Sequence, residues 1–267
     1  MAALLDQLPG RIWTGKAACL CAIGSLVKCM SSSTTTGESA GDGGGGGAIV
    51  QASSVVQALL TEASRKNDDY RRQAIVTLGE VLAHFASGRE KLNHFVEVAN
   101  VLYPLITQSD DAGATSDAAT TTNTSSSSSS SEDDKHKRPR KLVLQAASIT
   151  ALGKAWPADS TTQREQSQRL FDALLPILAH SPWNIKAAIL ATIGTVFASV
   201  IANNDQPLAL IGSAVTASMP LIRSCVCDNK FAAVKEAALK CVESLMSLGQ
   251  SDCALGVRRG LLAAGPD

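Results

Sequence analysis

Residues 183–200 read Trp-Asn-Ile-Lys-Ala-Ala-Ile-Leu-Ala-Thr-Ile-Gly-Thr-Val-Phe-Ala-Ser-Val, and this stretch decides the fold. Its apolar residues recur at intervals of three and four, which places them on one face of an α-helix. They form one stripe, made of Ile185, Ile189, Ile193, Val196, Phe197 and Val200. A second stripe with the same spacing runs through residues 234–248. Both patterns predict helices that are buried along most of one side.

The stretch is one copy of a repeat. Each copy starts with a basic or amide residue and small residues, and an aliphatic–glycine or aliphatic–acid pair follows. The copies run from Lys16-Ala17-Ala18 to Ile23-Gly24, Arg72-Gln73-Ala74 to Leu78-Gly79, Gln145-Ala146-Ala147 to Leu152-Gly153, Lys186-Ala187-Ala188 to Ile193-Gly194, and Lys235-Glu236-Ala237-Ala238 to Val242-Glu243. Gly153 and Gly194 lie 41 positions apart, a spacing within the HEAT period of about 40 to 47 residues. We predict an all-α protein, an α-solenoid of about five HEAT/armadillo-like helical hairpins.

Two low-complexity inserts interrupt the repeats. Ser, Thr and Gly dominate the first, and the second is serine-rich, then acidic, then basic. Such compositions bury too little apolar surface to offset ordering entropy, so we expect both inserts to be disordered. The expected order is an incomplete first hairpin (1–30), a linker (31–48), HEAT-type helices (49–108), a disordered insert (109–140), HEAT-type helices (141–250) and a tail (251–267).

Composition narrows the class of protein. Of 267 residues, 45% are hydrophobic and only 4% aromatic, which favours packed helices with Ala, Leu, Ile and Val in the core. Lys plus Arg and Asp plus Glu both number 24, so charge indicates no nucleic-acid partner. Seven cysteines without an export signal indicate a reducing compartment, and we expect a cytoplasmic and nuclear protein. Polar residues such as Thr192 and Ser199 disfavour membrane insertion of residues 187–204.

The sequence offers no convincing catalytic or cofactor site. The histidines lack nucleophile partners in the sequence, and we expect no enzyme, no cofactor and no metal. Cys19 and Cys21 fall two apart in a predicted helix and point to opposite sides, which disfavours chelation. Cys225 and Cys227 lack a second ligand pair, so packing is favoured over zinc. A cysteine nucleophile at Cys225 or Cys227 is the less favoured enzymatic alternative, because it needs a depressed thiol pKa.

A basic stretch closes the second insert and is a candidate nuclear import signal. Its basic residues are Lys135, Lys137, Arg138, Arg140 and Lys141. The alternative is a solvated flank that keeps the insert soluble, and composition alone favours this second interpretation.

Two blocks carry a more specific signal. Gly10-Arg11-Ile12-Trp13-Thr14-Gly15-Lys16 resembles the Gly-Arg-x-Trp-x-Gly-Lys segment near the C-terminal end of the HEAT-repeat proteasome adaptor and scaffold family. Leu152-Gly153-Lys154-Ala155-Trp156-Pro157, followed by Trp183, agrees with the same family in order and spacing. The family-signature residues are Gly10, Arg11, Trp13, Gly15, Lys16, Gly153, Lys154, Trp156, Pro157 and Trp183. For the tryptophans, hairpin packing is favoured over direct partner contact.

The resemblance implies a non-enzymatic scaffold. It implies binding to the core and regulatory particles of the 26S proteasome, and stabilising or monitoring of their assembly. Members of this family are several times longer, and residues 2–8 are too few to cover the first predicted helix. We therefore expect a C-terminal part of a longer scaffold, with the missing N-terminal repeats of the parent solenoid as neighbours. The alternative is another HEAT/armadillo adaptor, such as a nuclear transport receptor or a phosphatase scaffold.

Overall fold

The computed structural model describes residues 1–33, 45–84, 89–107, 132–203 and 207–247. The regular structure in these ranges is α-helical, which confirms the predicted all-α class. The helices are α1 (Ala2–Leu5), α2 (Lys16–Ser33), α3 (Gly45–Ala63), α4 (Asp68–His84), α5 (Arg89–Thr107), α6 (Glu132–Lys154), α7 (Ser160–His180), α8 (Trp183–Asn203), α9 (Pro207–Cys227) and α10 (Ala232–Ser247).

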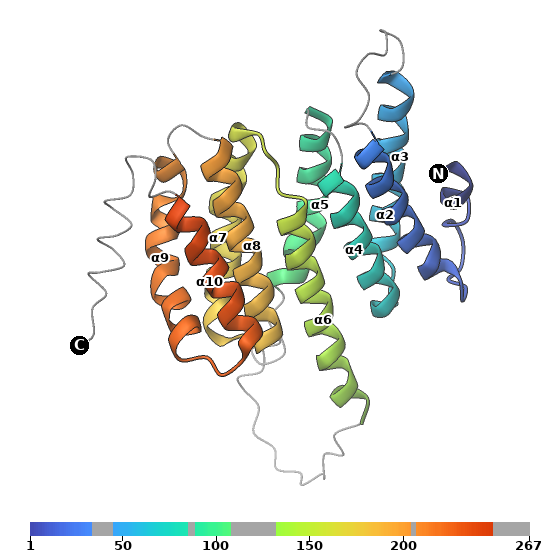
Figure 1. Ribbon diagram of the computed structural model, residues 1–267. Helices are drawn as coiled ribbons and strands as arrows, with labels where there is room; N and C mark the ends of the chain where they lie inside the picture. The colour runs from blue at the N-terminus through green and yellow to red at the C-terminus, as the bar shows by residue number, and fades with distance from the viewer. Residues whose placement is uncertain (34–44, 85–88, 108–131, 204–206, 248–267) are drawn as a thin grey trace, which may run out of the picture.

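The helices pair into hairpins that stack in two layers. The pairs are α3 with α4, α5 with α6, α7 with α8 and α9 with α10, and the short α1 precedes α2 in place of a full first helix. The even-numbered helices from α2 to α10 each pack on the next, and α3, α5, α7 and α9 form the second layer (Figure 1). The predicted stripe on α8 is fully buried between neighbours. This arrangement confirms the α-solenoid of about five hairpins.

Glycines bring neighbouring helices of the even-numbered layer into close contact. A Cβ atom added at Gly79 on α4 would lie 2.7 Å from the Cα of Ala151 on α6. A Cβ atom at Gly153 on α6 would lie 2.8 Å from Oγ1 of Thr192 on α8. Both distances are shorter than van der Waals contact, so these positions accept a neighbouring helix only because the residue has no side chain.

The same repeat position is looser at other junctions. A Cβ atom at Gly194 on α8 would lie 3.3 Å from Sγ of Cys241 on α10, and one at Gly24 on α2 would lie 3.6 Å from Cγ2 of Thr77 on α4. The four contacts, at Gly24, Gly79, Gly153 and Gly194, are called the glycine ladder below. The fifth repeat carries the exposed Glu243 at this position.

Side-chain hydrogen bonds accompany three steps of the ladder. In each, a donor two residues before the ladder position reaches a backbone carbonyl four residues before the glycine of the preceding repeat. The bonds are Thr77 Oγ1 to Leu20 O (3.2 Å), Thr192 Oγ1 to Ile149 O (3.0 Å) and Cys241 Sγ to Leu190 O (2.7 Å). The regular register means that the sequence repeat is a repeat of contacts between helices.

A second repeated contact closes the first four hairpins. A long side chain eight residues before the ladder glycine donates to a carbonyl at the end of the preceding helix or turn. The bonds are Lys16 Nζ to Gly10 O (3.5 Å), Arg71 Nε to Ala63 O (2.7 Å), Gln145 Nε2 to Ile106 O (2.6 Å) and Lys186 Nζ to Ala179 O (3.0 Å). These donors satisfy carbonyls that a helix end leaves without intrahelical partners. In the second repeat the donor is Arg71, one residue before the Arg72 expected from sequence.

The helices extend further into both inserts than expected. The helix α2 continues to Ser33 and α3 begins at Gly45, so parts of the predicted 31–48 linker are helical. The helix α6 begins at Glu132, inside the predicted 109–140 insert. The Glu, Lys and Arg residues there are good helix formers, and only Pro139 among residues 132–140 is a strong helix breaker. The rest of both inserts and the predicted tail at 251–267 lie outside the described residues.

Candidate functional site

The turns within hairpins lie along one edge of the solenoid, which is called the turn edge. It carries the α1–α2 turn (residues 6–15), the α3–α4 turn (64–67), the α7–α8 turn (181–182) and the α9–α10 turn (228–231). Residues 155–159, which join α6 to α7, lie at the opposite edge (Figure 1). The structure therefore separates the signature residues: the first block and Trp183 are on the turn edge, and Lys154, Trp156 and Pro157 are on the other.

The first block is a folded turn built around Lys16. Gly10 adopts a positive φ of 89°, a conformation that side-chain-bearing residues rarely take. Its carbonyl accepts from Nζ of Lys16, and the same Nζ lies 3.2 Å from Oε2 of Glu62 on α3. The exposed fractions of the two side chains are 0% and 2%. The charge of Lys16 therefore pairs with Glu62 inside the fold and links α2 to α3.

Glu62 stays ionised in this buried place. Burial acts to raise its pKa, but the hydrogen bonds from Arg65 and the nearby charge of Lys16 hold the pKa below its usual value. Arg65 donates through both Nε and Nη2, at 3.2 Å and 2.9 Å. Nζ of Lys16 also lies 5.5 Å from the centroid of the Tyr70 ring. The Glu62 carboxylate therefore links α3 to Lys16 of α2, and the contact of Lys16 with the Tyr70 ring extends this link to α4.

Trp13 and Arg11 form the outer part of the same turn. The Trp13 ring covers Gly15, where an added Cβ would lie 2.0 Å from its Cζ3 atom. Gly15 is therefore needed for the ring to lie flat against the turn. The Trp13 side chain is still 46% exposed, and Arg11 and Ile12 beside it are exposed as well. An arginine next to exposed apolar side chains has the composition of a protein-contact site.

The second block is structural. Gly153 is a ladder glycine, and Lys154 Nζ pairs with Oε1 of Glu80 across the α4–α6 junction. Trp156 is buried edge-on against Phe95 of α5, with ring centroids 5.6 Å apart. Pro157 is buried too, and its carbonyl accepts from Gln163 Nε2 at 2.8 Å. These contacts agree with the favoured packing interpretation.

Packing positions Trp156 without a hydrogen bond from its indole ring. Among the described residues, its Nε1 atom is buried without a hydrogen-bond partner. The ring is placed by its edge-on contact with Phe95 and by its burial between α5 and the loop after α6. Apolar packing, not hydrogen bonding, therefore positions this side chain.

Trp183 is exposed and paired. It is the first residue of α8, its side chain is 47% exposed, and it stacks on Phe231 of the α9–α10 turn. The ring centroids are 5.6 Å apart and the planes differ by 23°. Trp183 and Trp13 each precede a repeat lysine, Lys186 and Lys16, by three residues, so they occupy the same repeat position. The turn edge thus carries two exposed aromatic sites.

A hydrogen-bonded chain of Ser53, His94 and Glu97 was missed from the sequence. Ser53 Oγ lies 2.8 Å from Nε2 of His94, and Nδ1 of His94 lies 3.4 Å from Oε2 of Glu97. The order resembles a catalytic triad. Ser53 sits inside α3, however, where neighbouring backbone N–H groups are bonded within the helix and do not form an oxyanion hole. Ser53 and His94 lie 41 positions apart, so only the contact between α3 and α5 in the structure reveals this hydrogen-bonded chain.

Two of the described cysteines, Cys225 and Cys241, are buried. Burial raises the pKa of Cys225, opposite to the shift that a nucleophile needs. Burial also raises the pKa of Cys241 to about 12. Cys227 and Cys21 are exposed thiols. Among the described residues there is no cluster of three or more His, Cys, Asp or Glu side chains that would hold a metal ion.

The candidate import signal begins in α6. Lys135, Lys137 and Arg138 belong to the first turns of this helix, and their side chains lie outside the described set. Arg140 is exposed and Lys141 is half-buried. The structure places this stretch on a helix and leaves its role as an import signal a prediction.

Comparison with known proteins identifies the family. A family model described as "ECM29, C-terminal ARM-like repeats" matches residues 50–260. The chain is also 26% identical over 254 residues to the human "Proteasome adapter and scaffold protein ECM29", an alignment that covers 92% of this chain and 12% of the human protein. The matched region includes the hairpins from α3 to α10, whose stacking is that of armadillo-like repeats. The chain belongs to the family of ECM29 C-terminal ARM-like repeats.

Proposed function

We propose that this chain is a non-enzymatic adaptor that binds the 26S proteasome and stabilises or monitors the joining of its core and regulatory particles. The similarity to the human proteasome adapter and scaffold protein, over 92% of the chain, carries this proposal. The chain spans 12% of that relative, and we propose that it acts as the C-terminal part of a longer scaffold. A solenoid suits this role because it offers a long surface and few reactive groups.

The contact surface in this proposal is the turn edge. Arg11 and Trp13 in the first hairpin and Trp183 in the fourth are signature residues whose side chains are not consumed by the core. By contrast, Lys16, Trp156 and Pro157 are buried and serve the fold. Exposed tryptophan and arginine are the residue types that most often dominate binding energy in protein interfaces.

The test is co-migration of the purified chain with purified 26S proteasome on a native gel. The Trp13→Ala, Trp183→Ala double variant is expected to lose co-migration while circular dichroism shows unchanged helix content. The matched control is Trp156→Phe, a change at the opposite edge that keeps a buried aromatic ring. Failure of a folded wild-type chain to co-migrate would contradict the proposal.

The absence of enzymatic activity is part of the proposal and has its own test. The triad-like chain at Ser53 is the strongest candidate for catalysis. A fluorophosphonate probe labels serines that an adjacent histidine activates. We expect no labelling of Ser53, because no oxyanion hole faces its hydroxyl group. Labelling that disappears in Ser53→Ala would overturn the non-enzymatic assignment.

We further propose that the protein is cytoplasmic and nuclear and that none of its helices enters a membrane. Residues 183–203 and 210–227 are long and apolar enough to span a bilayer. Half of the first window is buried inside the solenoid, where α8 packs against α6, α7 and α10. The buried apolar residues of this first window belong to the protein core. Fractionation of cells, with Lys141→Ala, Arg140→Ala as the import variant, tests both points.

A further inference from the structure

The Trp183–Phe231 stack is an exposed apolar site on the turn edge. The two rings come from different hairpins, α7–α8 and α9–α10, and meet on the turn edge. Their exposed fractions are 47% and 39%. Single exposed apolar residues are ordinary, but two large rings held together form a continuous surface. This pair is called the aromatic pair.

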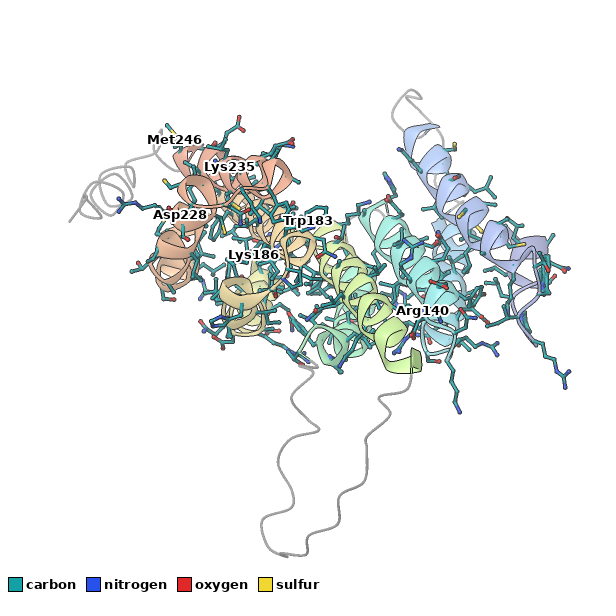
Figure 2. All side chains as sticks on the ribbon, turned by 90° about the horizontal axis from the view of Figure 1, so that it is seen from below. Arg140, Trp183, Lys186, Asp228, Lys235 and Met246 are labelled. Atoms are coloured by element: carbon teal, nitrogen blue, oxygen red, sulfur yellow. The ribbon has the colours of Figure 1, made fainter. Side chains whose placement is uncertain are left out.

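Lys230 lies against the aromatic pair, and two further lysines lie close to its residues in the sequence. Nζ of Lys230 lies 5.5 Å from the centroid of the Phe231 ring. Lys186 and Lys235 lie near the starts of α8 and α10, the helices that the two rings precede. Figure 2, which views the molecule from below, labels Trp183, Lys186 and Lys235 in the part of the solenoid formed by α7 to α10. The α9–α10 turn itself contains one acidic residue, Asp228.

The charge of this site is therefore positive. Lys186, Lys230 and Lys235 outnumber Asp228, and Glu236 next to Lys235 is paired with Lys240 at 2.8 Å. The first hairpin gives a contrast at the same repeat position. There Lys16 is buried on Glu62, so its charge is neutralised inside the fold and does not reach the surface beside Trp13.

We propose that the aromatic pair and its lysines bind an acidic, extended peptide segment of a partner protein, with an apolar side chain seated on the rings. The lysines would pair with carboxylates on both sides of that side chain. This inference rests on the proposed function and names the partner chemistry at one site of it. Single-stranded nucleic acid fits less well, because the rings stack on each other and each occludes a face that a base would need.

Fluorescence anisotropy with two labelled probe peptides tests the site on the full chain. One probe is a run of glutamates interrupted by a central phenylalanine, and the other replaces every glutamate by lysine. The glutamate probe is expected to bind, more weakly as salt rises, and the lysine probe is not. Trp183→Ala and the double variant Lys230→Glu, Lys235→Glu are each expected to weaken binding about tenfold.

Matched controls distinguish binding at this site from nonspecific binding of the probe. Met246→Ala removes another exposed apolar side chain, near the end of α10 and away from Phe231, and Arg164→Glu reverses an exposed charge near the start of α7, at the opposite edge. Both are expected to bind the glutamate probe as wild type does. Absent or equal binding of the two probes, equal losses in the controls, or tighter binding of oligothymidine would overturn the inference. Loss of proteasome co-migration with probe binding intact would instead contradict the proposed function.

Discussion

Two junctions of the solenoid, α2–α4 and α6–α8, join the same repeat positions through different interactions. At the second, Gly153 allows Thr192 to approach so closely that an added Cβ would lie 2.8 Å away. At the first, a Cβ atom added at Gly24 would lie 3.6 Å from Cγ2 of Thr77, which is an ordinary contact distance. A buried ion pair, Lys16 with Glu62, stands beside this looser junction. Steric fit thus dominates in the middle of the solenoid, and electrostatics contributes more at the first hairpin.

The largest effect is expected from breaking the ion pair. Lys16→Met leaves Glu62 buried with Arg65 as its remaining cation, so unfolding free energy should fall by about 3 kcal/mol. The double variant Lys16→Met, Glu62→Leu should recover most of the loss, because no uncompensated charge remains. Urea unfolding followed by circular dichroism measures both.

A control for this prediction lies on α10. Lys240 and Glu236 form an ion pair of similar length, 2.8 Å, with exposed fractions of 67% and 69%. Solvent and salt screen such a pair, so Lys240→Met should have little measurable effect. Equal effects of Lys16→Met and Lys240→Met would show that burial of the first pair has no energetic consequence.

The next largest effect comes from one substitution made at two ladder positions. Gly79→Ala gains about 1 kcal/mol of helix propensity but drives a methyl group into the α6 backbone, and overpacking costs about 1 to 3 kcal/mol. Gly24→Ala gains the same propensity and meets only an ordinary contact. We expect Gly79→Ala to destabilise the chain and Gly24→Ala to stabilise it. Thermal unfolding compares the two, and changes of the same sign would refute the distinction between tight and loose junctions.

Sequence alone predicted the helical class and the repeat because periodicity is a local signal. The stripe on α8 and the glycines at 79, 153 and 194 are visible as patterns, and each proved to be a contact between helices. The start of α6 at Glu132 was not predicted, because composition of the whole insert outweighed the helix propensity of its last residues. Low-complexity composition is therefore a poor guide to where an insert ends, if charged helix-forming residues lie next to a helix.

The candidate site was only partly visible in the sequence. The signature residues could be recognised as motifs, but motifs do not show which side chains are buried. Lys16 and Trp156 proved to be internal, whereas Trp13 and Trp183 remain half-exposed. Phe231 was missed because its partner Trp183 lies 48 positions away, and nothing local links them. Exposure and pairing across hairpins are properties of the stack, not of any one segment.

A smaller effect is expected from the hydrogen bonds of the ladder. Thr192→Val removes the 3.0 Å bond to the Ile149 carbonyl at the tight junction and should cost about 1 kcal/mol. Thr77→Val removes the 3.2 Å bond to Leu20 at the loose junction, and a smaller loss is expected there. Urea unfolding measures both variants. A larger loss for Thr77→Val would mean that hydrogen bonding, not steric fit, limits the first junction.

The last prediction concerns acid, because burial and ion pairing act on the pKa of Glu62 in opposite directions. The net shift is downward, so the carboxylate contributes stability above its unfolded pKa, about 4.3, and loses it as pH falls through its lower folded value. Once Glu62 is protonated, Lys16 has no charge to pair with there. The difference in unfolding free energy between wild type and Lys16→Met should therefore narrow below about pH 4.3, whereas other carboxylates cancel in the comparison. A difference that stays constant from neutral pH into this acid range would mean that Lys16 acts through the packing of its methylene chain and not through its charge.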